Sequence, residues 1–160
     1  MRIIVISDTH GNVNAIESVF LRNHDADLFI HLGDGDRDLD TFLSANPDYV
    51  NRTVNVCGNC DFNSLSPGFV ILPIFDHKIF ATHGHLFAVK NSLEIIKKTA
   101  KENECDIILY GHTHSRCNIN EDGFHILNPG SASIPRDGNK PSFGHIDIFY
   151  SGIVINIADV

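Results

Sequence analysis

The sequence predicts an α/β protein with two packed β-sheets and helices on their outer faces. Short apolar runs alternate with helical patterns over residues 2–110, and the remainder of the chain is strand-rich and divided by turn sequences. A chain of 160 residues with 42% hydrophobic content fits one domain over residues 1–160, which would bury about 70% of the surface of the unfolded chain. No linker, repeat or low-complexity segment divides it.

The first part of the chain predicts alternating strands and helices. Residues 2–6 form a short apolar run of strand length. Residues 13–23 carry apolar side chains on one helical stripe, so we expect a helix there. A second strand over residues 28–32, a short helix over residues 38–45 and a third strand over residues 53–57 continue the alternation.

The second part begins with a pair of expected strands, residues 69–75 and 78–82, joined at Asp76-His77. Residues 91–103 have apolar positions at helical spacing and predict an amphipathic helix, followed by a strand over residues 106–110. From residue 116 onward, apolar stretches are separated by expected turns, which are residues 120–123, 128–130 and 151–152.

Composition excludes several classes of partner. A net charge of −8, with no basic cluster beyond Lys97, Lys98 and Lys101, argues against an extended nucleic-acid footprint. No apolar run approaches the ~20 residues that span a membrane, and the first residues lack a signal-peptide core. We therefore expect a cytoplasmic protein with reduced cysteines, either a monomer or a homodimer. Such an acidic protein needs metal ions as a local positive charge to act on an acidic substrate.

Potential ligands follow five of the predicted strands directly. The groups are Asp8-Thr9-His10, Gly33-Asp34, Gly58-Asn59-Cys60-Asp61, His83-Gly84-His85 and Gly111-His112-Thr113-His114. Because ligand sites in open α/β sheets lie beyond the carboxyl ends of the strands, we expect these loops to converge on one crevice. Glycines beside the ligands allow sharp turns and close backbone approach.

The residue types in these loops indicate divalent cations. Carboxylate, imidazole and amide oxygen suit manganese, which we expect, and also iron, zinc or nickel. Seven side chains are too many for one ion and fit two ions that share a carboxylate: Asp8, His10, Asp34, Asn59, His83, His112 and His114. Two ions roughly 3.5–4 Å apart stabilise both oxygens of an in-line phosphoryl displacement, with a shared hydroxide as the nucleophile.

The pair Cys57 and Cys60 also matches Cys-x-x-Cys, which raises a redox centre or a structural zinc site as alternatives. A zinc site needs two further ligands at matching spacing, and Cys105 and Cys117 form no second pair. A redox motif would begin a helix, and the residues that follow show no helical stripe. We therefore assign the chemistry to Asn59 and expect Cys57 to be a small buried side chain.

An acidic run after Asp34 raises one further alternative, a calcium loop. Leu39 stands where such a loop needs glycine, and Ala45 stands where it needs glutamate, so we reject this interpretation. We expect Asp36, Asp38 and Asp40 to be a solvated run that begins a helix.

The chain closely resembles the calcineurin-like metallophosphoesterases, and among them the small single-domain bacterial and archaeal phosphodiesterases. The resemblance covers nearly the whole chain and rests on Asp8-x-His10, Gly33-Asp34, Gly58-Asn59-x-Asp61, His83-Gly84-His85 and Gly111-His112-x-His114, with Asn128-Pro129-Gly130-Ser131 downstream. It implies a four-layer α/β/β/α sandwich of two mixed β-sheets flanked by helices. It also implies that Asp34 bridges two metal ions, one held with Asp8, His10 and His114 and the other with Asn59, His83 and His112.

Three residues are candidates for a role in catalysis beyond the metal ions: Asn59, Cys60 and His85. Cys60 stands where the wider family usually has a histidine, so protonation of the leaving group is open at this position. His85 is a second-sphere residue, a phosphate contact or a turn residue. Arg136 is expected to be a surface arginine, with a phosphate contact as the alternative.

The leading hypothesis is a dinuclear metal-dependent phosphodiesterase that acts on a small or accessible phosphodiester. The alternatives are a non-enzymatic scaffold like the retromer subunit that resembles this family, and a phosphomonoesterase or nucleotidase with the same metal site. The presence of all seven candidate ligands favours an enzyme over a scaffold.

Overall fold

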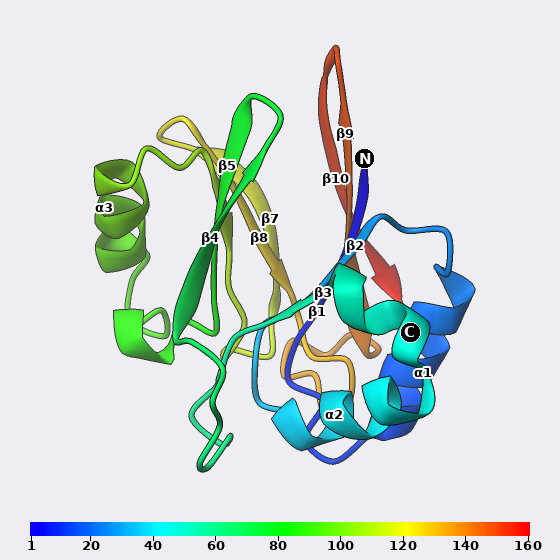
Figure 1. Ribbon diagram of the computed structural model, residues 1–160. Coiled ribbons are helices and arrows are strands. Elements are labelled where there is room, and N and C mark those ends of the chain that lie inside the picture. The colour runs from blue at the N-terminus through cyan, green and yellow to red at the C-terminus, as the bar shows by residue number, and fades with distance from the viewer.

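The computed structural model describes residues 1–160 and contains ten β-strands and three α-helices (Figure 1). The strands are β1 (Arg2–Ile6), β2 (Leu28–His31), β3 (Thr53–Asn55), β4 (Phe69–Ile74), β5 (His77–Thr82), β6 (Ile107–Leu109), β7 (Arg116–Glu121), β8 (Phe124–Pro129), β9 (Ser142–Phe149) and β10 (Gly152–Asp159). The helices are α1 (Val13–Arg22), α2 (Asp36–Ala45) and α3 (Glu94–Glu102), with 3-10 turns η1 (Pro47–Arg52) and η2 (His85–Phe87).

The strands form two mixed sheets. The first has the order β10-β9-β1-β2-β3 and the second the order β4-β5-β6-β8-β7. β1, β2 and β3 are parallel neighbours, as are β5, β6 and β8, whereas the outer pairs are antiparallel. The parallel strands of each sheet therefore end at the same edge, where the candidate ligands follow them.

Alternation along β1 shows why the sheets pack as four layers. Ile3 and Val5 point to a core between the two sheets, where they join Ile79 and Ile107 of the second sheet. Ile4 and Ile6 point to the opposite face of the sheet and pack with buried residues of α1 and α2. A third cluster joins the second sheet to α3. Figure 1 shows α1 and α2 outside the first sheet and α3 outside the second. The predicted α/β/β/α sandwich is confirmed.

Several element boundaries differ from the sequence-based expectation by one to three residues, and two of them lie next to the candidate site. The strand expected over residues 53–57 ends at Asn55, and two residues later the Cys57 N–H donates to the Pro67 carbonyl instead of to β2. Asn128 and Pro129, expected as a turn, are the last residues of β8, and the turn comes at Gly130 with a φ of 79°. Proline has no backbone N–H to donate to a neighbouring strand, and it is tolerated at a strand end because strand pairing does not need that donor there.

No helix in the structure has both the length and the apolar character to cross a membrane.

Candidate metal centre

The five loops that were expected to converge meet at the edge where the two sheets face each other. Asp8 and His10 follow β1, Asp34 follows β2 and Asn59 follows β3, all in the first sheet; His83 follows β5, and His112 and His114 follow β6, in the second. The loops are joined by backbone hydrogen bonds, including one from the His10 N–H to the Asp34 carbonyl (3.0 Å) and one from the Gly111 N–H to the His83 carbonyl (3.1 Å).

The backbone at this edge is held in an unusual conformation. Five of the candidate ligands lie in the left-handed region, with φ of 56° at Asp8, 47° at His10, 57° at Asp34, 67° at His112 and 57° at His114. This conformation costs a residue with a side chain roughly 1–2 kcal/mol, although Asp and His adopt it more readily than most. Local strain of this kind gathers at functional sites, where the surrounding structure enforces it.

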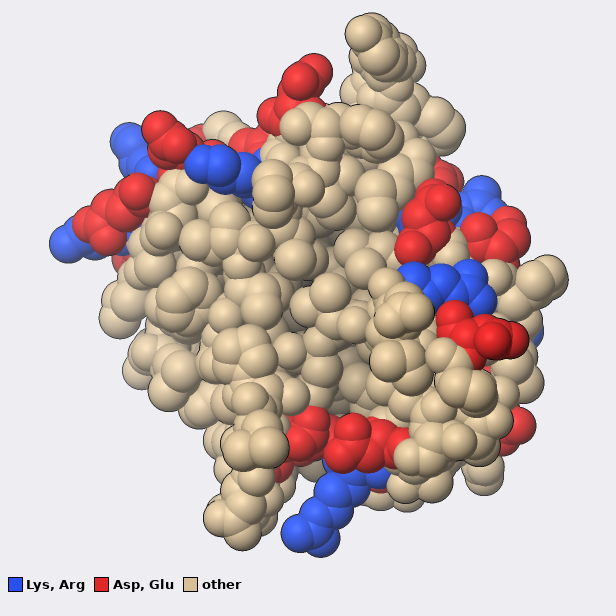
Figure 2. Space-filling model, in the orientation of Figure 1, with Lys and Arg blue, Asp and Glu red and all other residues tan.

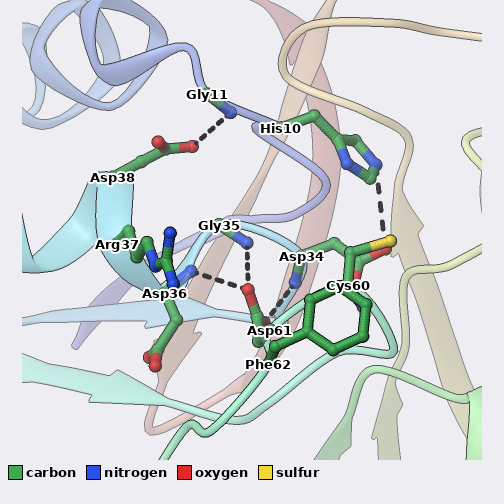
Figure 3. Close-up of a pocket in the computed structure, with 10 residues that line it drawn as sticks. All are labelled: His10, Gly11, Asp34, Gly35, Asp36, Arg37, Asp38, Cys60, Asp61 and Phe62. Atoms are coloured by element: carbon green, nitrogen blue, oxygen red, sulfur yellow. Dashed lines mark hydrogen bonds and ion pairs between the residues drawn. The ribbon is translucent and has the colours of Figure 1, made fainter.

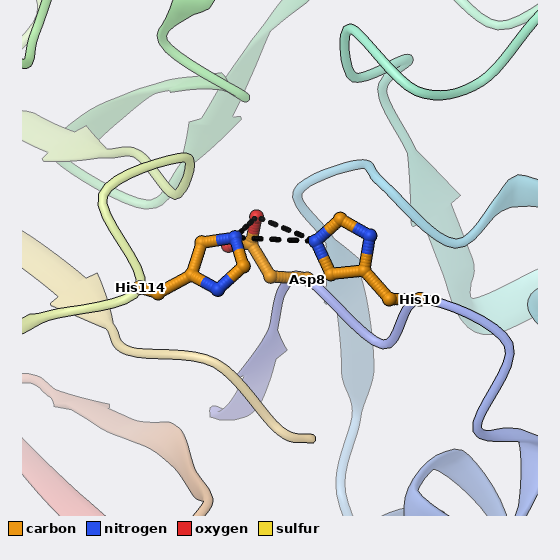
Figure 4. A group of neighbouring side chains, drawn as sticks. All are labelled: Asp8, His10 and His114. Carbon is orange, nitrogen blue, oxygen red and sulfur yellow. Dashed lines mark hydrogen bonds and ion pairs between the residues drawn. The ribbon is translucent and has the colours of Figure 1, made fainter. Parts of the chain in front are cut away.

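One group of candidate ligands is Asp8, His10 and His114 (Figure 4). The Nε2 atom of His114 lies 3.2 Å from Asp8 Oδ1 and 3.1 Å from the Nε2 atom of His10. His10 Nε2 lies 3.8 Å from the same Asp8 oxygen. Three ligand atoms from two loops, one after β1 and one after β6, are thus directed at one small volume.

A second group is Asp34, His83 and His112. His83 Nε2 lies 3.4 Å from Asp34 Oδ2 and 3.2 Å from His112 Nδ1. The amide oxygen of Asn59 lies 3.2 Å from His83 Nε2, so it belongs to this group as well.

Asp34 lies between the two groups. Its Oδ2 atom is 3.4 Å from His83 Nε2 and 3.7 Å from His10 Nε2. Asp34 is also the one carboxylate that the candidate metal clusters place with His10 in one cluster and with His83 and His112 in another.

Backbone carbonyls fix the orientation of two histidines. The Nδ1–H of His83 donates to the Leu32 carbonyl at 2.8 Å, and the Nδ1–H of His114 donates to the Ile134 carbonyl at 2.8 Å. Since a carbonyl can only accept, Nδ1 carries a proton in both rings and Nε2 is the atom that faces the site. This second-sphere arrangement is typical of metal-binding histidines.

One observation in particular indicates that these residues fit a divalent cation. Asp8 is completely buried, and its Oδ1 atom has no hydrogen-bond partner. A buried carboxylate oxygen without a partner is strongly unfavourable, and a cation among Asp8, His10 and His114 would compensate it.

In the metal-free protein, burial lowers the pKa of His83, but Asp34 and Asp8 outweigh burial and raise this pKa above its usual value. The hydrogen bond with Asp8 raises the pKa of His114, so a cation bound at either Nε2 atom would replace a proton. Burial raises the pKa of Asp8 and of Asp34, but the adjacent His114 and His83, respectively, outweigh it and hold both pKa values below their usual range. Burial and the charge of His83 lower the pKa of His112 to about 4, so its ring is neutral near pH 7. Ionised carboxylates and neutral imidazoles are the forms that coordinate a cation.

Asp61 joins two of the site loops without lying among the candidate ligands. Its Oδ2 atom accepts hydrogen bonds from the backbone N–H groups of Asp34 and Gly58, both at 2.7 Å. Its Oδ1 atom accepts from Gly35 at 2.9 Å and from Asp36 at 3.0 Å, which places a negative charge at the first turn of α2. This remote cap explains why α2 begins at Asp36, earlier than the expected residue 38.

The expectation that Asp38 is solvated was wrong. Asp38 is buried, and its Oδ2 atom accepts hydrogen bonds from Thr9 Oγ1 at 2.6 Å and from the Gly11 N–H at 2.8 Å. It therefore holds the loop that carries Asp8 and His10. Local sequence gave no indication of this, because the partners lie 27 and 29 positions away along the chain.

The downstream segment expected to border the site does so through two side chains. Ser131 Oγ donates to the Asp8 carbonyl at 2.7 Å. The Asn128 amide donates to the Gly111 carbonyl at 2.9 Å and to Thr113 Oγ1 at 3.0 Å. Both residues thus support loops that carry candidate ligands.

Cys60 lies at the solvent-exposed side of the site. Its backbone N–H donates to Asp34 Oδ1 at 2.7 Å, and its Sγ atom accepts from the Asn59 amide at 3.2 Å. The thiol also lies in a cluster with His10 and Asp34 whose ligand atoms are within 4.8 Å of one another. Partial burial and the adjacent Asp34 carboxylate raise the pKa of the Cys60 thiol to about 11.

His85 and Arg136 flank the two groups. The His85 ring is half-buried 5.4 Å from the His83 ring, centre to centre, and its Nδ1 atom has no hydrogen-bond partner. Burial lowers the pKa of His85, and the charge of His83 lowers it further. Arg136 is exposed, as expected for a surface arginine, and its backbone N–H donates to the His114 carbonyl at 2.9 Å.

Cys57 differs from the expectation of a buried side chain. It is half-buried, and its backbone N–H donates to the Pro67 carbonyl at 2.9 Å. All four cysteines are free. Cys57 belongs to none of the clusters that could hold a metal ion.

Carboxylates and imidazoles gathered at strand ends between two sheets define a metal-dependent hydrolase. The model of the calcineurin-like phosphoesterase superfamily domain matches residues 1–149, and the chain belongs to this family. It is accordingly a metal-dependent phosphoester hydrolase.

Individual relatives agree over nearly the full length. The chain is 31% identical to the probable metallophosphoesterase YsnB of Bacillus subtilis, over 99% of this chain and 91% of that protein. It is 30% identical to the phosphodiesterase YfcE of Escherichia coli K12, over 92% and 88%. A predicted phosphoesterase of Streptococcus pneumoniae has a similar crystal structure, with a TM-score of 0.84 and 30% identity over 99% of this chain and 88% of that one.

The retromer-type proteins share the fold. Vps29 of Entamoeba histolytica, in a structure with zinc, has a TM-score of 0.76 at 21% identity over 99% of each chain. At this identity, the likeness concerns the fold alone and carries no scaffold function to this chain.

Proposed function

We propose that this protein is a dinuclear metal-dependent phosphodiesterase that hydrolyses a small or accessible phosphodiester. The position of Asp34 carries the proposal. Its Oδ2 atom lies within 4 Å of ring nitrogens from both groups, His10 in one and His83 in the other. One oxygen within reach of two sets of ligands supports a pair of ions with a shared carboxylate rather than a single ion.

The residues would be divided as the family resemblance implies. Asp8, His10 and His114 would hold one ion with Asp34, and Asn59, His83 and His112 would hold the other with Asp34. Bound divalent cations supply a water nucleophile at neutral pH and stabilise negative charge on the phosphoryl oxygens. Nitrogen and oxygen ligands suit manganese, which is the metal we propose.

The chain's own residues contribute orientation. The carbonyls of Leu32 and Ile134 fix His83 and His114, and Asp61 fixes the backbone of Asp34. Such second-sphere contacts hold ligands within the narrow geometry that catalysis needs. Cys60 and His85, at the open side of the site, are the residues we propose to face the ester oxygens of a bound substrate.

The surface supports a small substrate over a long nucleic acid. On the face in Figure 2, Lys and Arg side chains are scattered among Asp and Glu and form no continuous band. The net charge of −8 is also unfavourable for a polyanion, so affinity has to come from the metal site itself. A phosphodiester with short arms meets this condition.

A manganese titration of the wild type and of one variant tests the proposal. Purified protein is freed of metal with a chelator, titrated with manganese, and assayed on bis(p-nitrophenyl) phosphate and on p-nitrophenyl phosphate. We expect two ions per chain, metal-dependent hydrolysis and a preference for the diester. Asp34→Asn should bind fewer than two ions and lose turnover by at least about 100-fold, since both ions lose their shared anion.

Three results would contradict the proposal: turnover that survives chelation, saturation at one ion per chain, or a preference for the monoester. The last result would favour a phosphomonoesterase. Asp40→Asn, an exposed aspartate on α2, is the matched control and should retain wild-type metal content.

A further inference from the structure

A pocket of about 320 Å³ opens beside the candidate ligands on the side of α2 (Figure 3). It extends from His10, Asp34 and Cys60 at one end to Arg37 and Phe62. The pocket is in the size range of small-molecule sites, and one wall is formed by the candidate metal centre. It is therefore the space that an ester arm of a bound phosphodiester would enter.

Four carboxylates line this pocket, and three of them already have partners in the fold. Asp38 and Asp61 accept the loop hydrogen bonds described above. Asp36 accepts hydrogen bonds from the Asn55 amide and from Ser66 Oγ. The fourth, Asp34, is a proposed metal ligand. The hydrogen bonds direct Asp36, Asp38 and Asp61 toward the loops but leave their negative charge, so an anionic arm in this pocket needs a cationic partner.

Arg37 is a pocket-lining residue whose positive charge has no ion-pair partner within the protein. Its side chain is exposed and forms neither an ion pair nor a hydrogen bond within the protein. Its backbone carbonyl is used in the helix, where it accepts from Thr41 Oγ1 at 2.8 Å, so the residue itself is held in place. A guanidinium group binds phosphate through two parallel hydrogen bonds, and in this pocket it has no competing internal partner.

Phe62 provides a flat apolar wall. Its side chain is 77% exposed although it is a large aromatic residue, and Figure 3 shows it at the edge of the pocket beside Asp61 and Cys60. The backbone of its loop is fixed by Asp61 and by a hydrogen bond from the Phe62 N–H to the Cys60 carbonyl at 3.1 Å. An exposed aromatic side chain on a fixed loop is a surface on which a nucleobase or similar ring stacks.

We infer that this pocket binds an ester arm that carries both a planar ring and a second phosphate group, as a nucleotide does. The ring stacks on Phe62, and Arg37 pairs with the second phosphate. The inference rests on the proposed function, because it requires the first phosphate of the substrate to lie at the Asp8–Asp34 metal centre.

Competition against a reporter substrate tests the inference. Hydrolysis of bis(p-nitrophenyl) phosphate by the manganese-loaded protein is inhibited with ribose 5-phosphate, thymidine 5′-phosphate or thymidine 3′,5′-bisphosphate. We expect the inhibition constant to fall by about tenfold at each step, as first a stacking ring and then a charge-paired phosphate is added.

The variants assign each step to a residue. Arg37→Gln should abolish the advantage of the bisphosphate over thymidine 5′-phosphate, and Phe62→Ala should abolish the advantage of thymidine 5′-phosphate over ribose 5-phosphate. The matched controls are Arg22→Gln, an exposed arginine on α1, and Leu65→Ala, an exposed apolar residue on the Phe62 loop that does not line the pocket. In both control variants, thymidine 5′-phosphate should still inhibit more strongly than ribose 5-phosphate, and the bisphosphate more strongly than thymidine 5′-phosphate.

The outcomes separate the two proposals. Metal-dependent turnover of the reporter with equal inhibition constants for the three compounds would overturn the inference and leave the phosphodiesterase proposal standing. Advantages that persist in Arg37→Gln and Phe62→Ala would also overturn it. Absence of reporter turnover with any divalent metal would overturn both.

Discussion

At the scale of single residues, the site depends on side chains whose environment is unfavourable without a cation. Asp8 is fully buried with an unpartnered oxygen, and Asp8, His10 and Asp34 all have a left-handed backbone. These costs oppose folding of the metal-free protein, and they pre-orient the ligands for a metal. Residue type and position are thus explained by the chemistry of the site rather than by packing.

Cys60 allows a test of proton donation at this scale. Its backbone, and not its thiol, makes the 2.7 Å hydrogen bond with Asp34, so we expect Cys60→Ser to retain two ions per chain by elemental analysis. Cys60→His introduces a general acid near neutral pH and should raise turnover of alkyl phosphodiesters by about 100-fold or less, with little change for nitrophenyl diesters, whose leaving groups need no proton.

The comparison of the two substrates in each Cys60 variant is the control for this prediction. Equal effects on alkyl and nitrophenyl diesters would mean that the new ring acts on binding rather than on the leaving group. Loss of metal from Cys60→Ser would identify the thiol as a ligand and contradict the assignment to Asn59.

The residues that sequence reasoning found are those whose chemical type and position after a strand both point to metal binding. Asp34 and His83 are of this kind, and the structure brings them within 3.4 Å. Asp38 was missed because its contacts with Thr9 and Gly11 depend on how α2 packs against the β1 loop, which no local pattern encodes. The position of Phe62 at the edge of the pocket could not be predicted for the same reason.

At the scale of elements, the β2 and β3 loops approach each other so closely that only glycine fits. A Cβ atom on Gly58 would lie 2.1 Å from Asp34 Oδ1 and 2.4 Å from the Asp34 backbone nitrogen. A Cβ atom on Gly33 would lie 2.5 Å from the Gly58 nitrogen. These contacts place the Asn59 loop against Asp34, so the glycines determine how closely these two candidate ligands approach each other.

Gly58→Ala should therefore damage the site directly. Overpacking of this kind lowers the free energy of unfolding by about 1–3 kcal/mol. Here the group that the new Cβ atom would displace is Asp34. We expect a folded protein by circular dichroism that binds fewer than two manganese ions in a titration calorimeter.

Gly138→Ala is the matched control. Gly138 has a φ of 78°, so alanine there is strained, but a Cβ atom would meet nothing within 4 Å. This variant should lose some thermal stability and keep wild-type metal binding. Full metal binding by Gly58→Ala would contradict the proposed contact.

Element types were predicted more reliably than element ends. Helix α3 and strand β5 were expected from their apolar periodicity, and both are present. The start of α2 depends on Asp61, which caps it from another loop, and the end of β8 depends on the turn at Gly130. Boundaries set by distant residues are not visible in a local pattern.

At the scale of the whole molecule, the candidate ligands come from both sheets. Asp8, His10, Asp34 and Asn59 belong to loops of the first sheet, and the three other histidines to loops of the second. Between the sheets lies an apolar core with Val5 on one side and Ile107 on the other. Bound ions would therefore join the two halves of the molecule at the edge of this core.

Metal removal should lower global stability. Ligands that bind only the folded state stabilise it by about 2.7 kcal/mol at 100 times their dissociation constant, which corresponds to a rise in Tm of roughly 5–11 °C for a protein of this size. We expect this difference between manganese-loaded and chelated protein in scanning calorimetry, and a smaller one in Asp8→Asn, which keeps the proposed ligands of the second ion. Identical Tm values for loaded and chelated wild type would contradict a metal site between the sheets.

The ring contact between His10 and His114 joins residues 104 positions apart. A ribosome would release the first sheet's ligands long before β6 and its two histidines emerge, and contacts of such high sequence separation form late in folding. A nascent or truncated chain would thus carry only a partial set of donors. We expect an N-terminal fragment of residues 1–75 to bind manganese no better than an unfolded chain in equilibrium dialysis. Metallation would then act as a maturation step that distinguishes finished molecules from incomplete ones.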